Sequence, residues 1–174
     1  MPPDPKAVIP VGAGSRAVLR HVIATLAYRA SKVLRDAPPE FAETTFGSTT
    51  RQPISIVVHM GDLIAWAISL TRGEHVWAPA GSRDWQAEVT RFFDGLTALD
   101  RALEHDLPAG ASEKLIQGPL ADALTHVGQL AMLRGMAGAP IRPESYARAD
   151  IAPGRVGLAQ SAPLAEFDGD ASSR

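Results

Sequence analysis

The sequence PLADALTHVGQLAMLR, residues 119–134, contains a carboxylate and an imidazole within an apolar helical pattern. Asp122 and His126 are four residues apart, so on an α-helix both side chains leave from nearly the same face. Two such groups can bind one metal ion, or they can hydrogen-bond to each other. Both arrangements are unusual on a face that is otherwise typical of a protein core. This stretch therefore marks a candidate site on a central helix.

A second apolar stretch carries another imidazole. Residues 54–68 have the sequence ISIVVHMGDLIAWAI, in which apolar residues lie nearly all round the predicted helix and His59 is close to its middle. We expect this imidazole to face inward, because it aligns with Ile56, Leu63 and Trp66. Two helices apolar enough to be central, each with ligand-type side chains, predict a site inside a helical bundle.

The three polar side chains allow a metal-binding and a structural interpretation. A single inward histidine is more often a hydrogen-bonded core residue than a metal ligand. We expect Asp122 and His126 to face inward as well. They align with Leu115, Leu130 and Leu133. A buried aspartate is unfavourable unless it is paired or binds a cation, and a structural Asp–His hydrogen bond satisfies this requirement as well as a metal does.

Four helical patterns predict an all-α fold, a four-helix bundle with long crossover connections and an irregular C-terminal tail. The first pattern covers residues 15–35 and the second residues 53–70. The third begins after Ser82, which is a good N-cap. The fourth begins either near Ser112 or at Pro119, a residue type favoured in the first turn of a helix. No strand pattern or internal repeat interrupts this series.

The same features divide the chain into three regions. Prolines and glycines predict a flexible N-terminal arm over residues 1–13. The bundle is expected over residues 14–138, because Gly138 is a natural stop for a helix that runs to about Met136. Residues 139–174 lack periodicity and predict an irregular, partly disordered tail, with a single turn between Ser145 and Ala149.

The composition excludes several classes of function. The 174-residue chain is 45% hydrophobic and 21% charged, with a formal net charge of −2 and a pI near 6.2. Its scattered cations predict no nucleic-acid partner. The lack of cysteine excludes disulfides, thiolate zinc sites and cysteine nucleophiles, and it fits a cytoplasmic location. We expect neither a secretory signal nor a membrane partner, since the longest apolar stretch is short and interrupted by polar residues.

Two short motifs in this order of helices resemble the DinB/YfiT-like superfamily of small metal-binding four-helix bundles. In that family one metal-binding histidine comes from the second helix and a His-x-x-x-His pair from the fourth, its second histidine followed by x-Gly-Gln. His59 in VVHM matches the first position, and His126 in HVGQ matches the end of the pair. Asp122 stands where the family has the first histidine of the pair. The resemblance covers about residues 14–138, and the long connection over residues 40–53 suits the crossover of the bundle.

The resemblance implies a divalent metal ion held by His59, Asp122 and His126. Two histidines with one carboxylate form a known open ligand set, and the carboxylate shifts the preference toward harder metals among zinc, nickel, manganese and iron. Open coordination positions would let the ion act as a Lewis acid and lower the pKa of bound water. Gln129, about one turn beyond His126, is expected either to contact the site or its substrate, or to be a solvated helix residue.

Family members include transferases that act with low-molecular-weight thiols and a maleylpyruvate isomerase branch. We therefore expect a metal-dependent transferase or hydrolase that uses a metal-activated water or thiol, with a small-molecule substrate and a low-molecular-weight thiol as partners. Members are often dimers, and the apolar third helix would permit a homodimer. The alternative is a non-catalytic bundle that binds a small ligand or self-associates, with Asp122 and His126 as a buried structural pair.

Other polar residues are expected to lie outside the site. Asp62 could orient the neighbouring imidazole, but we expect it to face solvent or to form a salt bridge. His21 and His105 lie off the apolar faces of their helices. His75 shares a connection with Trp77, and it would line the mouth of a pocket only if that loop folds back.

Overall fold

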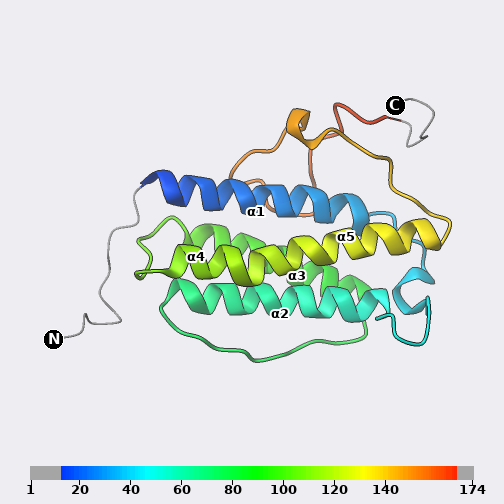
Figure 1. Cartoon of the computed structure of the whole chain (residues 1–174), viewed down its shortest axis with the longest axis horizontal. Coiled ribbons are helices and arrows are strands. Elements are labelled where there is room, and N and C mark those ends of the chain that lie inside the picture. Colours follow the sequence, from blue (N-terminus) through cyan, green and yellow to red (C-terminus); the bar gives the residue numbers. More distant parts are fainter. Residues whose placement is uncertain (1–12, 168–174) are drawn as a thin grey trace.

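A computed structural model describes residues 13–167, and it confirms the all-α fold (Figure 1). The long helices are α1, Ala13–Leu34; α2, Pro53–Thr71; α3, Trp85–Ala102; and a fourth rod composed of α4, Ala111–Leu115, a π turn, Ile116–Leu120, and α5, Ala121–Met136. Two short 3₁₀ helices, Phe41–Glu43 and Tyr146–Arg148, lie outside the bundle helices, and the second is the predicted turn. No β-strand is present within the described range.

The helices form a bundle in which α1 and α2 lie diagonally opposite each other. Each of these two helices packs against α3 and against α5. Arg91 of α3 donates a hydrogen bond to the Val58 carbonyl of α2, and further along both helices in the same direction Gly95 lies against Ile64. Helices α2 and α3 are therefore parallel, and α1 and α2 are not immediate neighbours.

The crossover of the bundle is the second connection rather than the first. Because α2 and α3 are parallel, residues 72–84 must return along the length of α2 before α3 begins (Figure 1). Residues 35–52 instead link the antiparallel helices α1 and α2 across the diagonal. The assignment of the crossover to the first connection is therefore wrong, since the length of a loop does not reveal the direction of the helix that follows it.

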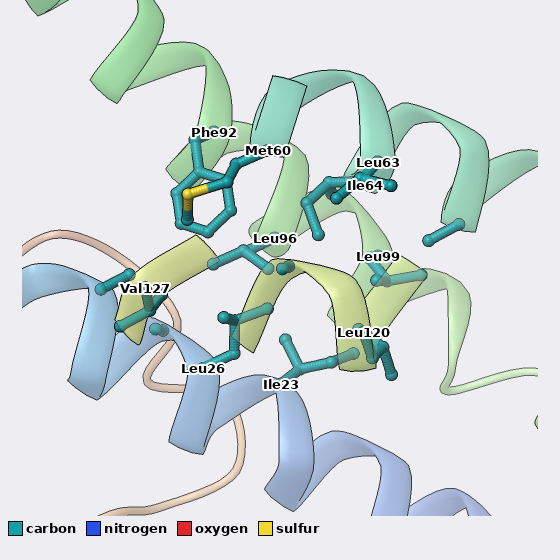
Figure 2. Close-up of a cluster of buried hydrophobic side chains, with 14 of the residues drawn as sticks. Ile23, Leu26, Met60, Leu63, Ile64, Phe92, Leu96, Leu99, Leu120 and Val127 are labelled. Atoms are coloured by element: carbon teal, nitrogen blue, oxygen red, sulfur yellow. The ribbon is translucent and has the colours of Figure 1, made fainter. Parts of the chain in front are cut away.

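The core runs along the middle of the bundle and draws on all four rods (Figure 2). Its members include Ile23, Leu26, Met60, Leu63, Ile64, Phe92, Leu96, Leu99, Leu120 and Val127, each at most 4% exposed. Helix α2 is the most apolar of the helices, and by length and composition alone it could cross a membrane. Most of α2 is buried against its neighbours, as expected of a central helix.

Helix α3 begins slightly later than the sequence predicts. Asp84, not Ser82, is its N-cap, since the Asp84 carboxylate accepts a hydrogen bond from the Ala87 N–H at 2.9 Å. The Ser82 hydroxyl instead accepts from the Asp84 N–H, just outside the helix. The buried residues of α3 include Val89, Phe92, Phe93, Leu96 and Leu99. These side chains belong to the core, so they are not available to form the surface of the predicted homodimer.

The fourth rod is one helix interrupted by a π turn. It begins at Ala111, next to the earlier of the two predicted starts, and Pro119 lies inside it. Proline lacks an N–H, and Gly118 departs from helical geometry at φ −99° and ψ −105°, so the helix is distorted here. Trp66 of α2 packs on Gly118, where an added Cβ would approach the indole to 3.0 Å. The small residue at the kink thus lets α2 approach the rod closely just before α5 begins.

The rod ends at Met136, and Gly138 stops the helix as predicted. Gly138 has a φ of +74°, and its N–H donates to the Gly135 carbonyl. The N–H of Ala139 donates to the Arg134 carbonyl at 2.9 Å, which completes a Schellman motif.

The described part of the C-terminal tail, residues 139–167, is irregular and packs over α1 (Figure 1). Glu144 accepts hydrogen bonds from Tyr28 and Lys32 of α1, both at 2.8 Å, and its side chain is 0% exposed. Lys32 also pairs with Glu166 at 2.7 Å. Buried polar contacts therefore hold this segment to the bundle. The end of the predicted tail and nearly all of the predicted N-terminal arm lie outside the described residues.

Candidate metal centre

Helices α2 and α5 are antiparallel neighbours and bring His59, Asp122 and His126 together. The Asp122 carboxylate lies beside both imidazoles, with Oδ2 at 3.4 Å from His59 Nε2 and Oδ1 at 3.3 Å from His126 Nε2. The centroids of the two imidazole rings are 5.0 Å apart, and the rings are nearly perpendicular. One potential ligand atom from each residue lies within 4.8 Å of the other two. The residues that the sequence proposed as ligands thus form one compact group.

The group lies in the wall of a surface cavity rather than deep inside the bundle. His126 has a side-chain exposure of 8%, His59 of 26% and Asp122 of 45%. The expectation that Asp122 is buried is therefore wrong. Asp122 lies on the flank of α5, between exposed Ala121 and buried Ala123, and helical spacing does not distinguish a flank from a buried face. Water can solvate this carboxylate, so it does not need a structural partner to offset burial.

Gln129 contacts the group through His126. Its Oε1 lies 2.7 Å from His126 Nδ1, one turn along the same helix. A carbonyl oxygen can only accept a hydrogen bond, so with Oε1 toward the ring this contact places a proton on Nδ1. In the neutral ring the Nε2 lone pair then faces Asp122. Of the two roles expected for Gln129, contact with the site is the one observed.

A cavity of about 510 Å³ opens beside the three residues. Helix α2 contributes Ile56 and His59 to its lining, and α5 contributes Asp122, His126, Gln129, Met132 and Leu133. The first connection closes it with Thr49, Thr50 and Arg51. A small molecule in this cavity would therefore meet the candidate ligands, a cation and apolar surface.

The crossover places Trp77 against the candidate site. The Trp77 ring meets the His59 ring edge to face at 5.7 Å between centroids, and it meets Trp66 at 6.0 Å. His75 lies against Trp66 at 5.2 Å, so the loop does fold back onto α2, but His75 is not part of the cavity lining. Sequence reasoning missed the contact of Trp77 with His59. The available signal was an aromatic residue near a histidine in a long connection.

Asp62 forms a salt bridge, as expected. Its Oδ1 accepts hydrogen bonds from Arg91 of α3 and from the backbone N–H of Ala80 in the crossover, both at 3.0 Å. The Arg91 guanidinium lies against Gly61, where an added Cβ would come within 2.6 Å of it. Asp62 therefore fastens both α3 and the crossover to α2, and in this way it helps to position the loop that carries Trp77.

The remaining histidines do not join the group. His21 on α1 and His105 after α3 are exposed.

Comparisons of the chain with protein-family models, with curated proteins and with solved structures found no match. The resemblance to the DinB/YfiT-like superfamily therefore depends on the order of the helices and on the short motifs around His59 and His126.

Proposed function

We propose that the protein is a metal-dependent enzyme of the DinB/YfiT-like type, with one divalent ion held by His59, Asp122 and His126. The observation that carries this proposal is the approach of two imidazoles and a carboxylate, from adjacent helices, to within 4.8 Å in the wall of a cavity. Burial of His126 and the contact of His59 with Trp77 restrict the motion of both rings. Restricted ligands lose less entropy when they bind an ion.

The separations between the Asp122 carboxylate and the two imidazoles suit a single small cation, and the two imidazoles lie within 4.8 Å of each other through their ligand atoms. Zinc binds nitrogen and oxygen at roughly 2.0–2.2 Å, so two ligands of a tetrahedral ion lie roughly 3.3–3.6 Å apart. The separations of 3.4 Å and 3.3 Å between the Asp122 carboxylate and the imidazoles are in this range. The tautomer set by Gln129 also favours an ion. It leaves an unprotonated Nε2 facing a carboxylate oxygen, which is unfavourable unless a cation or a proton donor lies between them.

An ion bound here would supply Lewis-acid chemistry to a coordinated water or thiol. Three protein ligands leave further coordination positions open, and the cavity gives a small substrate access to them. The residues of the chain bind and orient: His126 is held by Gln129, and Trp77 covers one edge of His59. The reaction classes that fit are hydrolysis by water and group transfer to a low-molecular-weight thiol.

A non-catalytic bundle is the alternative, in which the same contacts are structural. Two features favour the metal centre over this alternative. The contacts of Asp122 with the imidazoles are longer than the usual range of about 2.7–3.2 Å for N–H···O hydrogen bonds. The Asp122 side chain is also 45% exposed, so no buried charge requires the pairing.

Metal analysis tests the proposal. The protein should be purified without a histidine tag, and its bound metal should be measured by mass spectrometry against protein concentration. We expect about one divalent ion per chain. A metal-free, fully stable protein that also fails to bind zinc, nickel, manganese or iron in titration would support the non-catalytic bundle instead.

Replacing Gln129 by leucine should weaken metal binding about 10- to 100-fold, because the His126 ring would lose the acceptor that sets its tautomer. Zinc titration of the metal-stripped variant by calorimetry measures the change. Gln86→Leu, at an exposed position of α3, is the matched control and should bind zinc like the parent. Equal zinc affinities in parent and Gln129→Leu would show that this contact does not support the centre.

Replacing Asp122 by histidine would restore the family pattern on α5. We expect the variant to fold and to bind zinc or nickel at least as tightly as the parent, because imidazole suits both ions and position 122 is open to solvent. Calorimetry on metal-stripped protein compares the two affinities. A folded variant without any metal binding would mean that Asp122 has a role other than that of a ligand.

A further inference from the structure

We infer that the cavity beside the metal centre binds a small carboxylic acid whose carboxylate pairs with Arg51; this inference depends on the proposed metal centre. Arg51 directly precedes Gln52, the N-cap of α2, and it lines the cavity together with His59, Asp122 and other residues. It is the one lysine or arginine among the lining residues, all of which belong to the described part of the chain. The cavity therefore pairs a candidate ion with a single positively charged side chain.

Arg51 lacks a counter-ion within residues 13–167, although the same connection contains the acidic residues Asp36, Glu40 and Glu43. Glu43, the nearest of the three to Arg51 along the chain, pairs with Arg83 of the crossover at 3.1 Å. Arg83 also donates a hydrogen bond to Gln52 Oε1 at 2.9 Å. Because Arg83 engages both of these neighbouring acceptors, the guanidinium of Arg51 is available to a ligand in the cavity.

The metal centre and Arg51 lie at different places in the lining of the cavity, so each could bind one end of such a ligand. His59 lies six residues beyond Pro53, which places it roughly 9 Å along the axis of α2 from the end that carries Arg51. The hydroxyls of Thr49 and Thr50 lie beside Arg51 in the lining, and neither makes a hydrogen bond to another described residue. The other lining residues include the apolar Ile56, Met132 and Leu133. A molecule of a few carbon atoms could reach from the ion to the guanidinium across this apolar surface.

The net charge of the cavity lining depends on whether a metal ion is bound, and anion binding should therefore depend on the metal. Arg51 and Asp122 carry opposite charges, so with neutral histidines the metal-free lining has no net formal charge. A divalent ion would raise the net charge of the lining to about +2, which attracts small anions. A guanidinium also binds a carboxylate through two parallel hydrogen bonds. The expected substrates are therefore small carboxylates with a second group that can reach the ion.

Two thiols test this inference. Both 3-mercaptopropionate and 2-mercaptoethanol can place a thiolate on zinc, and only the first carries a carboxylate. Their affinities should be measured by calorimetry for the zinc-loaded parent, for Arg51→Ala and Arg51→Lys, and for the control Arg101→Ala. Arg101 is exposed on α3, which contributes no residue to this cavity. The zinc affinity of each protein is measured first, so that a failure of the metal centre is seen separately.

The zinc-loaded parent and Arg101→Ala should bind 3-mercaptopropionate about ten- to a hundredfold more tightly than 2-mercaptoethanol. Arg51→Ala should lose this preference while its affinities for zinc and for 2-mercaptoethanol stay unchanged, and Arg51→Lys should retain part of it. Zinc-loaded Arg51→Ala with the full preference would overturn the role of Arg51 and leave the metal centre standing. A parent that binds no metal would overturn the proposed function, and this inference with it.

Discussion

A His126→Ala variant is expected to lose metal binding and to keep most of its stability. The imidazole is the most buried of the three proposed ligands, and Gln129 orients it, so no other side chain can replace it. The folding free energy comes mainly from the apolar core of the four rods rather than from an ion. Truncating one side chain of this kind typically costs about 1 kcal/mol, which lowers the melting temperature of a chain of this size by roughly 2–4 °C.

The comparison that matters is between parent and His126→Ala, both stripped of metal in chelator. Asp122 is 45% exposed, so removal of the imidazole leaves a carboxylate that water can still solvate. A buried structural pair would behave differently, because a stranded buried charge costs on the order of 3–5 kcal/mol. A stability loss of that size without metal would defeat the metal-centre interpretation.

Several contacts join the bundle helices to the C-terminal tail. Among variants that remove one of them, Lys32→Met should lose the most stability. Lys32 is 8% exposed and donates a hydrogen bond to Glu144, whose side chain is 0% exposed. Methionine keeps the volume of the side chain but leaves the Glu144 carboxylate without its cation, which costs about 3–5 kcal/mol. Chemical unfolding at neutral pH measures the loss. Lys114→Met, at an exposed position of α4, is the matched control and should change stability by less than about 0.5 kcal/mol.

The pH dependence of this loss identifies its cause. Burial by itself raises the pKa of the Glu144 carboxyl, but hydrogen bonds from Lys32 and Tyr28 outweigh burial and hold the pKa below its ordinary value of 4.5. A carboxyl with a lowered pKa in the folded state stabilises the protein above its ordinary pKa, and the stabilisation is lost as the pH falls through the folded pKa. The gap between parent and Lys32→Met should therefore shrink as the pH drops below 4.5. A gap that does not change over this range would mean that the lost contact is not electrostatic.

The helices and the grouping of the site residues could be predicted from the sequence. The apolar spacing of α2 and α5 determines which residues share a face, and it placed His59, Asp122 and His126 toward neighbouring helices. The end of the fourth rod followed from Gly138, because an L-residue with a side chain rarely adopts its φ of +74°. The helices and their ends depend on residues close together in the chain, whereas the grouping of His59 with Asp122 and His126 followed from the inward faces of two helices and from the resemblance.

Features that depend on the relative direction of helices could not be predicted. The lengths of the connections, residues 35–52 and 72–84, do not show which of them joins parallel helices, so the crossover was assigned to the wrong connection. The contact of Trp77 with His59 was missed for the same reason, because Trp77 lies in the true crossover. The exposure of Asp122 was also missed. The exposure of Asp122 depends on how α5 is rotated toward α2 after the π turn. The spacing of apolar residues within α5 does not reveal this rotation.

The metal centre itself is tested most directly by anomalous diffraction from crystals of the zinc-loaded protein, measured at the zinc absorption edge. We expect one strong anomalous peak bounded by the Nε2 atoms of His59 and His126 and by the Asp122 carboxylate, at roughly 2.0–2.2 Å from each ligand atom. Crystals of a protein that carries stoichiometric zinc but shows its anomalous peak elsewhere, with the two imidazoles pointing to different faces of the bundle, would contradict the proposed centre.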